Sequence, residues 1–501
     1  MPRRPDDLRE RAALTSIGSR LETGPGAIAL RVHELDHLAP MDVAERLRDL
    51  PGLALLESAR PGRNARWSYA TADPVAVVDA PAEGPDVFAS ARRALARLSA
   101  DRVRVHADAG AEAVEDPPPF TGGLAGYLSY DLGRRLERWP SHTAIDQDLP
   151  SLRLALHDWV AAWDRRTGAA WLAGRALDEQ PRHLLERLDA VRERLASGGA
   201  ARAVHRPSRD DDDDRALRLR SNLDRPSYEA RVEAIRRAIA SGEIYQANLA
   251  RRLETPFRSD PWPLYRRLRT GDPARFGAYL DLGPSPATGA PRAIVSASPE
   301  PFLSLTSSGL VAADPIKGTR PRGRAPEDDR RLARELLGSP KDRAENVMIV
   351  DVLRNDLGRV CRPGSVRVPR LCRLERTAAV QHLVSTVTGR LRPGLDAFDL
   401  LGAAFPGGSI TGAPKLRAIE ILEGLEPVRR GPYTGAAGWI GADGAMQTSI
   451  LIRSFVADGD RLSLHVGGGI TWRSDPAAEW AETLAKAAGP LGAIGAREVA
   501  G

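Results

Sequence analysis

Lysine is almost absent from this chain. Its 501 residues include 72 basic side chains, but only four of them are lysines, at Lys317, Lys341, Lys415 and Lys486. Arginine is not deprotonated in proteins, so it cannot act as an amine nucleophile, whereas lysine can. A lysine in a chain whose other basic residues are nearly all arginine is therefore a candidate for covalent chemistry. Lys317, in the basic segment 314–323, is the first candidate; a solvated lysine in a surface loop is the alternative.

Cysteine and long apolar runs are also scarce. The two cysteines, Cys361 and Cys372, are too few for a disulfide framework, which favours a reducing compartment. No run of about 18 apolar residues exists to span a membrane, and the Arg-rich segment 1–25 lacks the apolar core of a signal peptide. We therefore expect a soluble, cytoplasmic protein with a frayed start at 1–25 and no membrane partner.

The chain also lacks a large excess of one charge. Its 72 basic and 66 acidic residues leave a net charge of +6, and arginines stand beside acids in helix-like segments such as 186–194. A nucleic-acid-binding surface needs a clustered basic face, so this composition argues against one. An Arg-rich nucleic-acid-binding protein is kept as the alternative from a different functional class.

An acidic segment interrupts the chain near its middle. The run of aspartates at 210–214 follows small residues, and such a segment cannot bury itself, so a linker or exposed loop is expected at 201–226. It separates an N-terminal region at 26–200 from a C-terminal region at 227–495. The predicted strands are 27–32, 67–69, 293–298, 302–305 and 461–466, and the predicted helices are 86–99, 180–196, 227–241, 326–338, 340–357, 416–422 and one that starts at 475 and ends before Gly489.

Three glutamates are candidate metal ligands. A helix start at 474–476 places Glu479 and Glu482 three residues apart on one helix face, and Glu345 lies on another predicted helix. Mg²⁺ takes oxygen ligands, commonly one or two carboxylates together with water and an anionic substrate. Glutamates with this spacing also occur on solvent-exposed helix faces. Spacing alone therefore does not distinguish metal ligands from surface side chains.

Two glycine-rich segments are candidates for anion binding. Segment 405–415 leads into a predicted helix, and 467–469 follows a predicted strand, so both can present backbone N–H groups to a ligand. Neither matches a P-loop or a dinucleotide-binding fingerprint, and ordinary turns are the alternative. A nucleotide cofactor is therefore not expected.

Seven segments, taken together and in order, resemble the motifs of the chorismate-utilising enzymes, a family that includes anthranilate synthase component I, aminodeoxychorismate synthase component I, and isochorismate and salicylate synthases. They are 244–249, 298–300, 315–323, 345–356, 381–385, 405–415 and 474–483. The resemblance covers roughly 227–490 and is thinner before that, where 55–58 and 122–127 carry it. It implies an α+β, anthranilate-synthase-like fold in which β-sheets pack face to face with helices outside. Both halves of the chain would build this unit, which makes the acidic segment a surface excursion.

The resemblance also implies a reaction. Anthranilate synthases usually carry a small residue at the position of Lys317, whereas aminodeoxychorismate synthases carry a lysine. In the mechanism of the latter, the lysine amine adds at C2 of chorismate as the C4 hydroxyl leaves, and ammonia then adds at C4 and expels the lysine. We expect 4-amino-4-deoxychorismate, a precursor of 4-aminobenzoate and folate, as the product. Synthesis of anthranilate or 2-amino-2-deoxyisochorismate is the alternative.

Each candidate residue matches a family motif position, and its role is implied by that match. Besides Lys317, the implied roles are general acid for Glu300, catalytic or structural histidine near the ring for His382, Mg²⁺ ligands for Glu345, Glu479 and Glu482, enolpyruvyl carboxylate binding for Tyr433 and Arg453, and close substrate contacts for Thr411, Gly467, Gly468 and Gly469.

The resemblance further implies partners. Neither cysteine lies on the glycine-flanked elbow that a glutamine amidotransferase needs. A separate amidotransferase subunit, forming a heterodimer with this chain, would supply ammonia, and a separate lyase would complete 4-aminobenzoate. The motif at 55–58 belongs in relatives to a tryptophan pocket, and whether this chain binds tryptophan is left open.

Overall fold

The computed structural model describes residues 26–499 apart from 33–34, 36, 63–64, 81–83, 85, 108–115, 198–216 and 378–379. The frayed start expected at 1–25 and most of the expected acidic segment lie outside the described residues. Within them the strands form one sheet of 14 strands and one of 10. No described helix is long and apolar enough to cross a membrane.

The larger sheet interleaves the two halves of the chain. Its order is β24 (Arg497–Val499), β10 (Arg218–Ser221), β11 (Gln246–Pro256), β23 (Arg461–Ile470), β22 (Ser454–Asp458), β13 (Pro291–Ser298), β12 (Phe276–Pro284), β2 (Ala54–Glu57), β3 (Trp67–Thr71), β8 (Trp159–Asp164), β9 (Ala170–Arg175), β1 (Ala27–Arg31) and β5 (Arg104–Ala107), with β19 (Gly412–Ala413) beside β11. The pairing of β2 with β12 joins the N-terminal strands to the C-terminal ones.

The smaller sheet packs face to face on the larger one. Its order is β16 (Ile316–Pro321), β18 (Val380–Arg390), β15 (Leu310–Ala313), β14 (Pro301–Leu305), β21 (Met446–Ile450), β20 (Ala436–Gly441), β6 (Gly123–Leu128), β7 (Leu152–His157) and β4 (Ala76–Asp79), with β17 (Arg367–Arg376) beside β18. Between the sheets, Trp439 of β20 meets Tyr69 of β3 edge to face, with ring centroids 5.9 Å apart.

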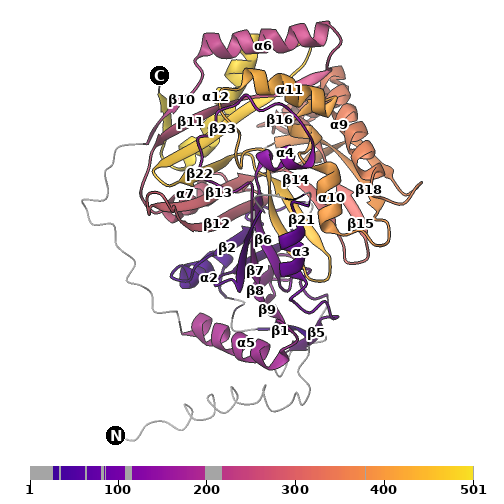
Figure 1. The fold of residues 1–501 in the computed structure, drawn as a ribbon. Helices are drawn as coiled ribbons and strands as arrows, with labels where there is room; N and C mark the ends of the chain where they lie inside the picture. Colours follow the sequence, from indigo (N-terminus) through magenta and orange to yellow (C-terminus); the bar gives the residue numbers. More distant parts are fainter. Residues whose placement is uncertain are drawn as a thin grey trace, which may run out of the picture.

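Helices cover the outer faces of both sheets (Figure 1). The larger sheet carries α2 (Pro40–Leu47), α5 (Pro181–Ala196), α7 (Trp262–Gly271) and α12 (Pro476–Ala493), and α6 (Arg225–Ala240) and α11 (Lys415–Leu425) pack near β11 and β23. The smaller sheet carries α3 (Ala89–Leu95), α8 (Pro326–Gly338), α9 (Pro340–Gly358) and α10 (Ala397–Ala404), and α4 is Gly133–Leu136. The predicted α+β arrangement, with facing sheets and outer helices, is confirmed.

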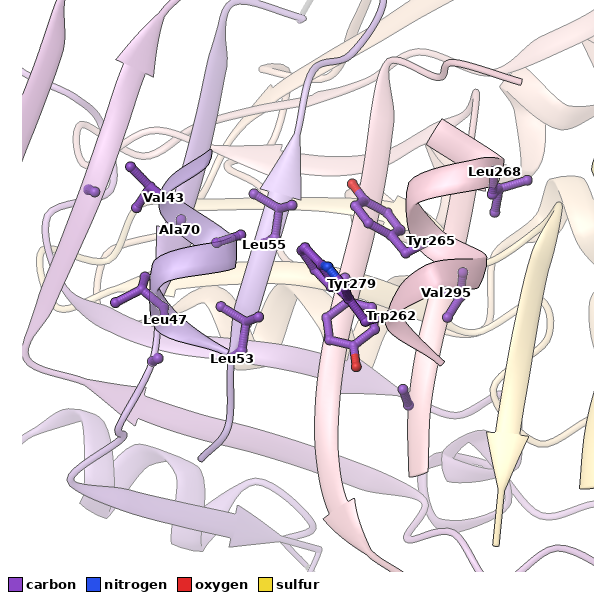
Figure 2. Close-up of a cluster of buried hydrophobic side chains, with 14 of the residues drawn as sticks. Val43, Leu47, Leu53, Leu55, Ala70, Trp262, Tyr265, Leu268, Tyr279 and Val295 are labelled. Atoms are coloured by element: carbon purple, nitrogen blue, oxygen red, sulfur yellow. The ribbon is translucent and has the colours of Figure 1, made fainter. Parts of the chain in front are cut away.

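The core under α2 and α7 joins the two halves of the chain. Figure 2 shows Val43 and Leu47 of α2 in one cluster with Trp262 of α7. Trp262 in turn meets Tyr279 of β12 edge to face at 4.8 Å. Each large apolar side chain buried this way contributes about 1.5–3 kcal/mol, so the two halves stabilise each other.

Most predicted elements are present, but several predicted ends are wrong. The helix expected at 86–99 is the shorter α3, and the helix expected at 416–422 continues to Leu425 in α11. The last strand and the last helix are both longer than expected. β23 does not stop at 466: it continues through the three glycines to Ile470, because β11 pairs with them throughout. The last helix does not end before Gly489 but runs past Pro490 to Ala493. Pro490 and Leu491 are buried, so tertiary packing outweighs the weak helix propensity of glycine and proline.

Candidate active site

Lys317 lies on β16 at an irregularity of that strand. The next residue, Gly318, has φ +75°, a conformation that favours glycine. The Lys317 Nζ donates a hydrogen bond to the Ser409 carbonyl oxygen at 2.8 Å. Burial lowers the pKa of Lys317, although the nearby carboxylates of Glu300 and Glu345 act in the opposite direction. The lysine is thus shifted toward its neutral, nucleophilic form.

Glu300 stands between β13 and β14, next to Lys317. Its backbone is fixed there, because its carbonyl oxygen accepts a hydrogen bond from the Ile450 N–H at 3.0 Å. Burial raises the pKa of Glu300 in spite of the opposing charge of Lys317. A carboxyl shifted toward its protonated form beside an amine shifted toward its neutral form is the pairing that a general acid and a nucleophile require.

Glu479 and Glu482 of α12 converge on Gly468. A Cβ at Gly468 would lie 3.4 Å from Glu479 Oε2 and 3.3 Å from Glu482 Oε1, so a side chain at position 468 would crowd both carboxylates. Burial raises the pKa of Glu479. Burial also acts to raise the pKa of Glu482, but Lys486, whose Nζ is 2.7 Å from Glu482 Oε1, lowers it overall. The two carboxylates therefore differ in proton affinity.

Glu345 of α9 is the third carboxylate of this group. Its Oε1 is buried and has no hydrogen-bond partner among the described residues, and the nearest cation, Lys341 Nζ, is 3.9 Å away. No three acidic, histidine or cysteine side chains of the described residues form a ready-made metal centre. Mg²⁺ needs only one or two protein carboxylates besides water and substrate. The partnerless Glu345 oxygen and the carboxylates around Gly468 fit that donor set.

The segment between α10 and α11 brings Ser409 and Thr411 to the site. The Ser409 carbonyl oxygen that binds Lys317 also accepts a hydrogen bond from Asn248 Nδ2 at 2.6 Å. Thr411 is fully buried, and its hydroxyl donates to the Gly407 carbonyl oxygen at 3.0 Å. In this structure Thr411 shapes its own loop, and its predicted contact with substrate stays a prediction.

His382 and Arg453 form a second group of predicted residues. His382 Nδ1 lies 2.9 Å from Thr319 Oγ1. Burial lowers the pKa of His382 to about 4, and the charges of Arg275, Arg453 and Arg60 add to this effect. No hydrogen bond in the described part of the chain joins His382 to the Lys317 group, but β16 links them because it carries both Lys317 and Thr319.

The side chain of Arg453 is exposed, and its backbone is left-handed with φ +52°. Its nearest acid is Asp272, at 3.9 Å, which leaves the guanidinium fork accessible to an anion. Tyr433 is buried and stacks on His465, with centroids 4.9 Å apart and the rings 10° from parallel. Burial raises the pKa of Tyr433 to about 12, so its hydroxyl stays protonated and can donate a hydrogen bond.

The sequence reading missed Gln246 and Asn248, although both lie in one of the segments that carry the resemblance. Gln246 is fully buried, its Oε1 has no hydrogen-bond partner among the described residues, and its Nε2 donates to Asn248 Oδ1 at 3.3 Å. A Cβ at Gly469 would lie 2.4 Å from Gln246 Nε2. The available signal was segment 244–249 itself. In the fold, the glycines of β23 that pair with β11 leave room for the two amide side chains.

The sequence reading also missed a buried arginine behind the site. Arg430 is 2% exposed and binds both carboxylate oxygens of Glu426, at 2.9 and 2.7 Å. It also donates to the carbonyl oxygens of Ile410, at 2.9 Å, and Asn248, at 2.5 Å. Arg430 thus ties the Ser409–Thr411 loop to β11.

The motif at 55–58 borders a small cavity. Glu57 is engaged by Arg269, whose Nη2 lies 2.6 Å from Glu57 Oε1, and the Ser58 hydroxyl donates to the Trp67 carbonyl oxygen at 2.8 Å. The cavity beside them measures about 40 Å³ and is bordered also by Trp439. Small-molecule sites span about 300–1,000 Å³, so a tryptophan ligand would require these groups to move apart. Another cavity, of about 500 Å³, is lined by residues of α3 and α10 and by the residues that follow α9, and none of the predicted site residues lines it.

We accordingly expect millimolar L-tryptophan to leave chorismate turnover unchanged. The carboxylate of Glu57 already binds Arg269, and the cavity of about 40 Å³ has room for a few water molecules but not for an indole ring. Initial rates with and without tryptophan, and isothermal titration calorimetry, are the measurements. Inhibition together with saturable binding would contradict the expectation and show that the cavity opens.

Comparison with known proteins agrees with this geometry. A model of the family described as chorismate binding enzyme matches residues 54–492. The chain is 41% identical to aminodeoxychorismate synthase component 1 of Klebsiella aerogenes over 74% of this chain and 76% of that protein, and 38% identical to anthranilate synthase component 1 of Streptomyces coelicolor over 89% and 84%. The structure of anthranilate synthase component I from Streptococcus pneumoniae superposes with a TM-score of 0.69 at 27% identity, covering 86% of this chain and 93% of that one. The chain belongs to the chorismate binding enzyme family.

Proposed function

We propose that this enzyme converts chorismate and ammonia to 4-amino-4-deoxychorismate. The observation that carries the proposal is the pair of Lys317 and Glu300, whose pKa values are shifted in opposite directions by burial. An amine attacks only when it is neutral, and a carboxyl protonates a leaving group only when it holds a proton. Several relatives, including the one from Klebsiella aerogenes, are named aminodeoxychorismate synthase component 1.

The reaction is proposed to run in two substitutions. In the first, the neutral Lys317 nitrogen forms a bond to C2 of the ring, both conjugated ring double bonds shift, and the C4–oxygen bond breaks. Glu300 gives its proton to the leaving hydroxyl, which departs as water. In the second, ammonia forms a bond to C4, both double bonds shift back, and the C2–nitrogen bond breaks to release the lysine as an amine.

The other residues bind and orient the substrate. Glu345, Glu479 and Glu482 would hold Mg²⁺, which supplies positive charge for the ring carboxylate of chorismate. Arg453 offers a forked pair of N–H donors to the enolpyruvyl carboxylate. His382 would stand on the Arg453 side of the ring, since the two belong to the same group of residues.

The ammonia is proposed to come from a partner. The names of the relatives include the words component 1, and both cysteines of this chain are buried, where a thiol cannot attack glutamine. A glutamine amidotransferase subunit would form a heterodimer with this chain and deliver ammonia. The product would enter 4-aminobenzoate and folate synthesis in the cytoplasm.

A product assay separates this proposal from anthranilate synthesis, the activity named for the Streptomyces coelicolor relative. The purified chain is incubated with chorismate, Mg²⁺ and ammonium at alkaline pH, and the products are separated by chromatography with mass detection. We expect 4-amino-4-deoxychorismate without anthranilate. Anthranilate with an equal amount of pyruvate would show instead that the nitrogen is added at C2.

The pH dependence tests the pairing of acid and nucleophile. The reactive state needs neutral Lys317, which is lost at low pH, and protonated Glu300, which is lost at high pH. We therefore expect a bell-shaped profile of kcat at fixed free ammonia. Glu300→Gln should lower kcat by about 10²–10⁴-fold and remove the alkaline fall, because no acid then remains to be deprotonated. The exposed Glu327→Gln is the control, and an alkaline fall that persists in Glu300→Gln would assign that limb to another group.

A further inference from the structure

Arg275, between α7 and β12, is a buried cation outside the residues assigned so far. It is 7% exposed, and its Nη2 lies 2.7 Å from Oε1 of Glu375 on β17. The N-terminal half packs on its other side: a Cβ at Gly62 would lie 2.5 Å from Arg275 Nε, and the Arg60 N–H donates to the Ala274 carbonyl oxygen at 3.0 Å. The guanidinium is therefore held from both sides.

The partner of Arg275 is also the strand neighbour of His382. Glu375 of β17 stands directly opposite His382 of β18 in the antiparallel register, which places their Cβ atoms about 4.5–5.5 Å apart. A free carboxylate at this distance attracts an imidazole and stabilises its protonated form. The ion pair with Arg275 engages the Glu375 carboxylate and compensates its charge.

The remaining groups around His382 favour the neutral form of its imidazole. On the β16 side its Nδ1 lies 2.9 Å from the Thr319 hydroxyl. Arg275, Arg453 and Arg60 are the cations that act on it, and each disfavours a second positive charge there. Glu375 is the acid that the strand register places opposite His382, and its carboxylate is paired with Arg275.

We propose that Arg275 is a positioning residue: it holds the Glu375 carboxylate away from His382 and so keeps the imidazole neutral, bound to Thr319 and available to the substrate. The effect on turnover rests on the proposed function. The effect on the histidine itself does not, because it depends only on the charges in the folded protein.

A double-variant cycle tests the proposal. The wild type, Arg275→Gln, Glu375→Gln and the double variant are labelled at histidine, and the His382 signals are assigned by their loss in His382→Gln. We expect Arg275→Gln to raise the pH at which His382 titrates by about one unit, because a carboxylate is set free beside it. The double variant should titrate between the wild type and Arg275→Gln, because it lacks both the cation that disfavours the protonated imidazole and the carboxylate that favours it, and Glu375→Gln should titrate no higher than the wild type.

Turnover provides the second readout. Arg275→Gln should lower kcat several-fold between about pH 4 and 5, with recovery toward neutral pH, where the imidazole is neutral in both proteins, and Arg275→Lys should retain most of the activity. Urea unfolding shows which variants keep the fold. The proposal is overturned if His382 titrates alike in Arg275→Gln and in the double variant. Failure of the wild type to aminate chorismate would instead refute the proposed function and leave the titration result standing.

Discussion

Lys317→Ala is expected to lower formation of 4-amino-4-deoxychorismate by at least about 10³-fold, with chorismate affinity nearly unchanged. The amine is the only group proposed to form a bond to C2, whereas substrate binding is spread over the carboxylate and arginine groups. Without the lysine, ammonia or water would add at C2 directly, so a low yield of anthranilate or isochorismate is the expected residual product. Product analysis by mass spectrometry and binding by calorimetry measure the two effects separately.

Two further variants sharpen this test. Lys317→Arg keeps the positive charge but cannot be deprotonated, so it should be as inactive as the alanine variant. Lys341→Ala removes an exposed lysine near Glu345, at 3.9 Å, and should retain most of the turnover. Intact-protein mass spectrometry of a quenched reaction without ammonia should show an adduct on the wild type alone. Normal amination by Lys317→Ala would rule out the covalent role.

Arg430→Met is expected to destabilise the protein by about 3–5 kcal/mol, because it leaves the Glu426 carboxylate buried without its cation. The lost contacts also include the hydrogen bonds to the carbonyl oxygens of Ile410 and Asn248. The site should therefore loosen before the whole chain unfolds. Urea unfolding followed by tryptophan fluorescence gives the stability, and the KM for chorismate reports the loosening.

Two control variants distinguish the effect of leaving a buried charge without its partner from the effect of losing an exposed arginine. Arg417 pairs with Glu243 and Glu420 on the surface, so Arg417→Met should leave the free energy of unfolding nearly unchanged, because solvent screens exposed pairs. Adding Glu426→Gln to Arg430→Met should recover part of the loss, because no uncompensated charge then remains buried. Equal stability of Arg430→Met and Arg417→Met would show that the buried pair contributes little.

The sequence was enough to propose which side chains form the site, but it did not show how deeply each of them is buried. Lys317 stood out because lysine is rare, and Glu300 and the three magnesium candidates were located by motifs. The structure places Lys317 near Glu300 and Glu345, and Gly468 against Glu479 and Glu482. What no motif stated is the burial that shifts the pKa values of Lys317 and Glu300, since burial depends on strands from distant parts of the chain.

The supporting residues could not be predicted for a related reason. Arg430 is one of many arginines; its partner Glu426 is only four residues away, but the burial of this pair and its hydrogen bonds to Ile410 and Asn248 depend on the fold. Arg275 meets Glu375 only because the segment between α7 and β12 comes against β17 in the fold. Charge pairs between distant segments leave no local pattern, whereas helix caps and glycine-rich turns do.

The strand order has a consequence for how the protein is made. β22 and β23 lie between β13 and β11, so this part of the larger sheet is filled by a segment that is synthesised long after its neighbours β11 and β13. Until then β11 and β13 present unpaired edges, and such edges pair readily with other chains. The candidate active site depends on the same strand β23, which carries the glycines, and on the following helix α12, which carries Glu479. A nascent chain therefore has neither this part of the sheet nor these site residues until β23 and α12 have been synthesised.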